Sequence, residues 1–152
     1  MNEKSRPPVA DGVLVIRRRF AVSRHRLFQA WVDQKDMARW YTEQELGQAD
    51  ISDFDLSVGG GYVAKFGPKT ESPWIERVQY RELVPPRNIR LLTSMTKDAA
   101  FVGMTEVDIT INDLAEGSEL VLTETGVEPA SLNDRNGGWS RTLDNLARHL
   151  AP

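Results

Sequence analysis

One arginine and a set of tyrosines and tryptophans are the side chains of this sequence best suited to chemistry. Arg18 alternates with Leu14 and Ile16, so it points toward the same apolar face. An arginine turned inward needs an anionic partner, because an isolated buried charge is too costly. That partner is either an acid of the chain, such as Glu124, or a carboxylate or phosphate of a ligand.

Tyrosine and tryptophan suit a partly wet pocket, because each carries a polar atom that prefers a hydrogen bond. Several of these residues stand near the ends of predicted elements. We expect the binding residues to be Arg18, Trp40, Tyr41, Tyr62, Phe66, Trp74, Tyr80, Leu143 and Leu146.

Other reactive patterns point away from catalysis. Cysteine is absent, which excludes thiol nucleophiles, iron–sulfur sites and disulfides. His25 and His149 stand at opposite ends of the chain beside arginines, a setting unsuited to binding a cation. Gly59–Gly61 lies between two strands, whereas a dinucleotide loop leads into a helix. Glu106 and Asp108 alternate with apolar residues and should face water. We therefore expect no catalytic residue, no metal and no cofactor.

Composition indicates one ordinary globular domain. The 152 residues are 40% hydrophobic and 27% charged. A chain of this length and composition can build a hydrophobic core without a disulfide or a structural metal. A net charge of −3 argues against nucleic-acid binding. The longest apolar run, Val13–Ile16, is too short to span a membrane. We expect a cytoplasmic protein that is a monomer or homodimer.

Basic residues gather near the N-terminus. The first 26 residues contain seven Lys and Arg against two acids. Arg17, Arg19, Arg24 and Arg26 form a basic edge, which is either simply solvated or a docking surface for an acidic protein.

The hydrophobic pattern predicts a strand, two short helices, six more strands and a long helix. Residues 1–12 should be a flexible lead-in, and residues 13–152 a single domain. The first strand is Val13–Phe20, Ser23 is a helix N-cap, and the helices run from Arg24 to about Tyr41 with a break near Asp33. The later strands are approximately Ile51–Val58, Gly61–Phe66, Trp74–Val84, Asn88–Ser94, Val102–Ile111 and Ser118–Thr125.

The last helix carries an apolar stripe of Trp139, Leu143, Leu146, Ala147 and Leu150, and begins either at Ser131 or after Gly137-Gly138. No long helix separates the strands, so the sheet should be antiparallel. These features predict an α+β fold in which a curved sheet of about seven strands wraps around the C-terminal helix. A curved sheet and a cylinder do not fill each other's space, so a mostly apolar cavity should lie between them.

Four segments in this order resemble the START-like (SRPBCC) helix-grip superfamily, in the branch named after the activator of the heat-shock protein 90 ATPase. They are Leu14–Trp40, Phe54–Tyr62, Tyr80–Pro86 and Gly138–Leu146. The resemblance spans about residues 13–150. It implies the helix-grip fold and, in many relatives, a pocket for a lipid or metabolite. It also implies a co-chaperone role in the eponymous member and cyclase or aromatase chemistry in a few distant ones.

The sequence departs from the family at Ser23–Arg26, where relatives have proline and acidic residues. Basic residues at a helix N-terminus oppose the macrodipole. We therefore expect acids or a bound anion beside this turn.

These observations predict a non-catalytic domain that holds a small hydrophobic or amphipathic ligand between the sheet and the C-terminal helix. One alternative is a co-chaperone-like regulator of a chaperone ATPase, which would use the basic edge. The other is an enzyme of the polyketide cyclase or aromatase type, with Arg18 and tyrosines polarising a carbonyl.

Overall fold

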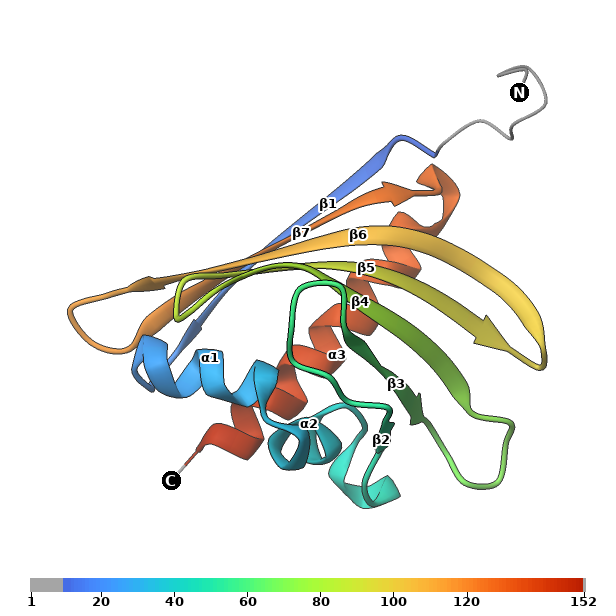
Figure 1. Ribbon diagram of the computed structural model, residues 1–152, viewed down its shortest axis with the longest axis horizontal. Coiled ribbons are helices and arrows are strands. Elements are labelled where there is room, and N and C mark those ends of the chain that lie inside the picture. The colour runs from blue at the N-terminus through green and yellow to red at the C-terminus, as the bar shows by residue number, and fades with distance from the viewer. Residues whose placement is uncertain (1–9, 152) are drawn as a thin grey trace.

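The computed structural model describes residues 10–151, and most of the predicted lead-in lies outside this range. One antiparallel sheet has the strand order β1-β7-β6-β5-β4-β3-β2 and curves over the long helix α3, while α1 and α2 lie on the same side of the sheet (Figure 1). The elements are β1 (Gly12–Phe20), α1 (Arg24–Val32), α2 (Gln34–Trp40), η2 (Gln44–Leu46), β2 (Asp50–Ser52), β3 (Gly61–Phe66), β4 (Trp74–Val84), β5 (Asn88–Lys97), β6 (Ala100–Asp113), β7 (Ser118–Val127), η3 (Pro129–Ser131) and α3 (Leu132–Leu150). The predicted fold class is confirmed. Among the described residues, no helix has the length and hydrophobicity needed to cross a bilayer.

Most strand boundaries agree with the sequence pattern, but the predicted strand Ile51–Val58 is wrong. Only Asp50–Ser52 pairs with β3. Asp53 then has φ of 52°, which turns the chain out of the ladder. The following loop closes on itself through a 2.8 Å bond from the Gly60 amide to the Ser57 carbonyl. Turn geometry therefore outweighs the apolar pattern of this segment, whose Val58 is 65% exposed.

Capping side chains set the ends of the two short helices. The Ser23 hydroxyl accepts a bond from the Arg26 amide at 3.2 Å, which confirms the predicted N-cap. Asp33 ends α1, and its carboxylate caps α2 by accepting from the Asp36 amide at 2.9 Å. The acids expected beside the basic first turn are also present. Arg26 lies 3.0 Å from Asp36, and Arg24 lies 3.4 Å from Asp113.

Helix α3 begins before the two glycines, so the earlier of the two predicted starts is correct. Leu143 and Leu146 are fully buried, as expected of the apolar stripe. Ala147 is exposed, contrary to the prediction, and Asn145 is buried instead. The buried stripe is displaced because α3 packs against α2 as well as against the sheet.

Strand alternation separates an inner from an outer face of the sheet. Val107, Ile109 and Ile111 of β6 are completely or almost completely buried on the inner face. Glu106 and Asp108 therefore lie on the outer face, as predicted, where each is 3.6 Å from Arg90 of β5. The same alternation places a group of polar side chains among the inner apolar residues.

Candidate functional site

Polar side chains form a band across the inner face of the sheet. We call this group the inner polar band. Its sheet residues occupy inward positions on β3 to β7, and its other members come from the end of α2 and from α3. Thr93 of β5 and Thr105 of β6 are direct register partners at its centre. The members are Tyr41, Tyr62, Glu76, Thr93, Thr105, Glu124, Arg135 and Trp139.

Glu76 is the centre of one half of the band. Its carboxyl group is buried and accepts two hydroxyl bonds of 2.6 Å, from Tyr41 to Oε1 and from Thr93 to Oε2. The Tyr62 hydroxyl lies 2.6 Å from that of Tyr41. Because Tyr41 donates its proton to Glu76, its oxygen remains to accept from Tyr62. This half of the inner polar band is therefore a continuous series of hydrogen bonds that runs from Tyr62 of β3 to Thr93 of β5.

Burial is the main influence on the protonation states of Glu76, Tyr41 and Tyr62. Burial raises the pKa of Glu76, although the bonds from Thr93 and Tyr41 oppose the rise. Burial, followed by the nearby Glu76 charge, raises the pKa values of Tyr41 and Tyr62 well above 10. The two phenols therefore keep their protons at neutral pH and act as hydrogen-bond donors.

Glu124 is the centre of the other half and is completely buried. Arg135 donates to it through both Nε, at 3.1 Å, and Nη2. Trp139 Nε1 donates to Oε1 at 3.0 Å, and the Thr105 hydroxyl to Oε2 at 2.6 Å. The guanidinium balances the charge and the other donors fill the remaining acceptor positions, which is what a buried carboxylate requires.

Arg18 does pair with an acid of the chain, which was one of the two predicted alternatives, but that acid is not Glu124, the example suggested from the sequence. Arg18 instead lies 2.7 Å from Asp144 of α3. On β7 the register partner of Arg18 is Leu120, whereas Glu124 lies opposite Leu14. Four residues along a strand correspond to about 13 Å, so Arg135 on α3 reaches Glu124 in place of Arg18.

Two buried donors beside the band have no hydrogen-bond partner among the described residues. They are Tyr80 Oη and Trp31 Nε1. Tyr80 is 1% exposed, and its ring centroid is 5.9 Å from that of Tyr62. Trp31 packs against Trp139, with 6.3 Å between the ring centroids. Burial raises the pKa of Tyr80, so its hydroxyl also stays protonated.

The structure brings only part of the predicted set together. Tyr41, Tyr62 and Tyr80 lie in or beside the band, and Phe66 packs on Tyr41 at a centroid distance of 5.6 Å. Leu143 and Leu146 belong to the buried core.

Three predicted residues have other contacts. Trp40 is 1% exposed, and its Nε1 donates to the Ala30 carbonyl at 2.8 Å, so this indole joins α2 to α1. Trp74 lies at the end of β4, with the Lys97 ammonium 4.8 Å from its ring centroid. Arg18 is held in its pair with Asp144.

Sequence reasoning missed Glu76, Thr93, Thr105 and Arg135, and saw Glu124 only as a partner for Arg18. A signal for Glu76 was present in the sequence. It alternates with Val78 and Tyr80 on one strand, so an acid shares a face with residues that must be buried.

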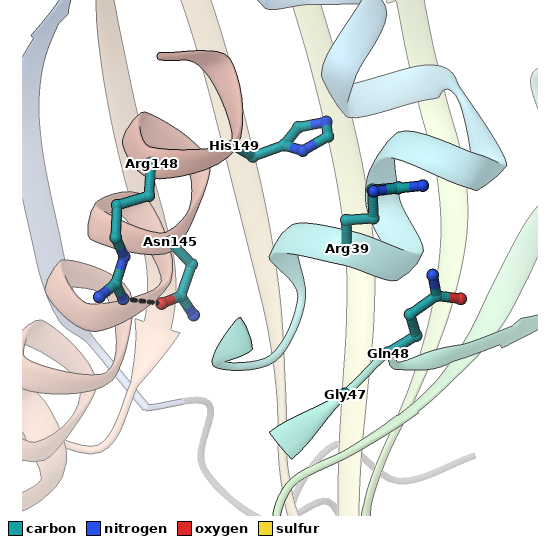
Figure 2. Close-up of a pocket in the computed structure, with 6 residues that line it drawn as sticks. All are labelled: Arg39, Gly47, Gln48, Asn145, Arg148 and His149. Atoms are coloured by element: carbon teal, nitrogen blue, oxygen red, sulfur yellow. Dashed lines mark hydrogen bonds between the residues drawn. The ribbon is translucent and has the colours of Figure 1, made fainter. Parts of the chain in front are cut away.

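A separate pocket has a volume of about 260 Å³ (Figure 2). One of its sides is formed by α2 and the loop after α2, and the other by the C-terminal half of α3. It is lined by Arg39, Gly47, Gln48, Asn145, Arg148 and His149, which include no residue of the predicted set.

The antiparallel sheet curves around the C-terminal helix, and two short helices follow the first strand. This is the helix-grip arrangement of the START-like superfamily. The family model "Activator of Hsp90 ATPase homolog 1-like protein" matches residues 21–151. The chain therefore belongs to this family, and the resemblance inferred from the sequence is confirmed.

Solved structures agree with this assignment. A protein from Chromobacterium violaceum is 25% identical, with a TM-score of 0.82 over 92% of this chain and 97% of the other. A protein from Rhizobium loti is 26% identical, with a TM-score of 0.79 over 95% of this chain and 100% of the other. DynU16, from the dynemicin biosynthetic locus, is 16% identical with a TM-score of 0.75 and shares the fold over 92% of this chain and 47% of its own. No curated protein gave a significant match.

Proposed function

We propose that this domain binds a small amphipathic molecule between the inner face of the sheet and α3, and that it does so without catalysis. One observation carries the proposal. The Tyr80 hydroxyl is buried beside the inner polar band and has no acceptor among the described residues. A buried polar group without a partner costs about 1–3 kcal/mol, and an oxygen atom of a bound ligand would remove that cost.

The surroundings of Tyr80 suit the apolar part of such a ligand. Leu91 of β5 is the register partner of Tyr80 and is 4% exposed. Val107 continues this apolar row on β6, and Leu143 and Leu146 of α3 belong to the same hydrophobic core cluster as Tyr80. A ligand that replaces some of these contacts would keep its apolar part out of water, while its oxygen accepts from Tyr80.

The hydrogen bonds of the band favour binding over chemistry. Both oxygens of Glu76 already accept hydroxyl bonds, and those of Glu124 accept from Arg135, Trp139 and Thr105. The four donors on Glu124 fill its acceptor positions, whereas Glu76 keeps a free lone pair on each oxygen but is only 6% exposed. Cyclase or aromatase chemistry is therefore the weaker proposal.

The test combines native mass spectrometry of the purified protein with a thermal-shift screen of fatty acids, sterol-like compounds and aromatic compounds. We expect at least one class to raise Tm in the wild type and to do so less in Tyr80→Phe. Glu106→Gln, on the outer face of the sheet, is the matched control and should respond as the wild type does. The proposal fails if no class stabilises the protein, or if Tyr80→Phe responds as strongly as the control.

A second candidate is regulation of a chaperone ATPase, which is favoured by the family match. The basic edge gives it limited support, because Arg24 and Arg26 already pair with acids of the chain and Arg17 lies 3.5 Å from Glu119. Arg19 is the exposed member for which no such pair is found among the described residues. ATP turnover by a purified Hsp90-type chaperone, measured with excess protein and with Arg19→Gln, tests this candidate. Unchanged turnover would argue against it.

A further inference from the structure

The pocket between α2 and α3 has the size and the lining of a binding site for a small polar molecule. Its volume of about 260 Å³ is just below the roughly 300–1,000 Å³ of sites for drug-sized ligands. Apart from Gly47, its lining residues are two arginines, two residues with side-chain amides and one histidine, and they come from two sides, α3 and the α2 loop region (Figure 2). It contains no member of the inner polar band, so a ligand in this pocket would bind independently of one on the inner face of the sheet.

The charge of the pocket is positive. Arg39 and Arg148 have no carboxylate within 4.0 Å among the described residues. His149 Nε2 lies 2.7 Å from Asp36, the acid that also accepts two bonds from Arg26 at 3.0 and 3.1 Å. Arg26 therefore already balances the charge of that acid.

Acids near the pocket do not neutralise the two arginines. Glu43, Glu45 and Asp50, on the segment after α2, are exposed, and none of them forms an ion pair with a described residue. The guanidinium group of Arg148, beside Asn145, can therefore act on an anion that enters the pocket, whereas that of Arg39 points away from these two residues and adds positive charge at longer range (Figure 2).

A buried amide gives the pocket a directed donor. Asn145 is 8% exposed, and its Oδ1 accepts from Arg148 Nη2 at 2.6 Å. Its side-chain nitrogen makes no hydrogen bond to a described residue. Basic residues in the last turn of a helix complement the macrodipole. This accounts for the positions of Arg39 and Arg148, but not for a buried carboxamide in the wall of the pocket.

We propose that this pocket binds a small oxyanion, a carboxylate or phosphate group, through Arg148 and the Asn145 amide. Guanidinium groups match the planar geometry of carboxylate and phosphate oxygens. The contact with Asn145 holds Arg148 in place before binding, which reduces the side-chain entropy lost when the anion binds. Gln48 and the backbone of Gly47, which has φ of 94°, line the opposite wall.

The test is an NMR titration of the whole chain with sodium phosphate and, separately, with sodium succinate, at an ionic strength kept constant with sodium chloride. We expect saturable shifts of the Asn145 side-chain NH₂ and of the Gly47 and Gln48 amides with at least one anion. The comparison of the two titrations tells phosphate from carboxylate recognition. Arg148→Gln should weaken the binding at least tenfold, and Arg39→Gln should weaken it by less.

Arg77→Gln is the matched control, because Arg77 is exposed on β4 and its loss changes the net charge equally. The control and Tyr80→Phe should both bind the anion as the wild type does, which separates this proposal from the one about the inner face. The proposal is overturned if the shifts do not saturate, if chloride alone reproduces them, or if Arg77→Gln weakens binding as much as Arg148→Gln.

Discussion

The Tyr80 hydroxyl allows a test in which removing a polar atom should stabilise the protein. Tyr80 is 1% exposed, and its Oη has no partner among the described residues. Tyr80→Phe keeps the ring and deletes the polar side-chain atom that loses its hydration on folding without gaining a hydrogen-bond partner among the described residues. Without a ligand, the free energy of unfolding should rise by about 1–3 kcal/mol.

The same change in the free energy of unfolding can be converted into a shift of Tm. The entropy of unfolding is about 2.1 cal/mol/K per residue, or about 0.3 kcal/mol/K for 152 residues. The expected rise in Tm of the ligand-free protein is therefore about 3–9 °C. Urea denaturation followed by circular dichroism should give a higher midpoint with an unchanged slope.

Tyr62→Phe is the control, because it makes the same chemical change on the neighbouring strand. The Tyr62 hydroxyl lies 2.6 Å from that of Tyr41, so its removal breaks a hydrogen bond and should lower stability by about 0.5–1.5 kcal/mol. The two substitutions should thus act in opposite directions. If Tyr80→Phe is destabilised like Tyr62→Phe, the Tyr80 hydroxyl already has a partner in the folded protein, and the reasoning for a ligand oxygen is refuted.

Three further predictions concern the rest of the fold. Arg135→Met leaves the Glu124 carboxylate buried without its cation and should cost about 3–5 kcal/mol in urea denaturation, whereas adding Glu124→Gln should recover most of that loss. A double variant as unstable as the single one would contradict this. Burial acts to raise the pKa of Asp36, but its bonds to Arg26 and His149 outweigh burial and lower it. Asp36→Asn should therefore reduce stability at pH 7, and the difference from wild type should shrink as pH falls below about 4; a constant difference between pH 7 and pH 3 would show that the charge is not the cause. A Cβ at Gly138 would meet no atom within 4 Å, so Gly138→Ala should stabilise α3 by about 0.5–1 kcal/mol, and a lower Tm would contradict the helical packing seen at this position.

The local elements could be predicted because their causes lie within a few neighbouring residues. Alternation at period two marks the strands, and it placed Glu106 on the outer face of β6 correctly. Ser23 and Asp33 were recognisable as helix boundaries because a cap bonds to an amide only three residues away. The prediction failed after Ser52, where a residue at positive φ turned an apolar segment into a loop.

The contacts of the candidate sites were decided by tertiary structure. The partner of Glu124 depends on where α3 crosses the sheet, which places Arg135 within reach and leaves Arg18 to Asp144. The pocket beside Asn145 likewise exists only because α2 and its loop pack against the end of α3. Residue types and alternation determine which side chains face inward, because they act along one strand or helix. Which of these side chains meet depends on register and helix placement, which are set by the packing of the whole core.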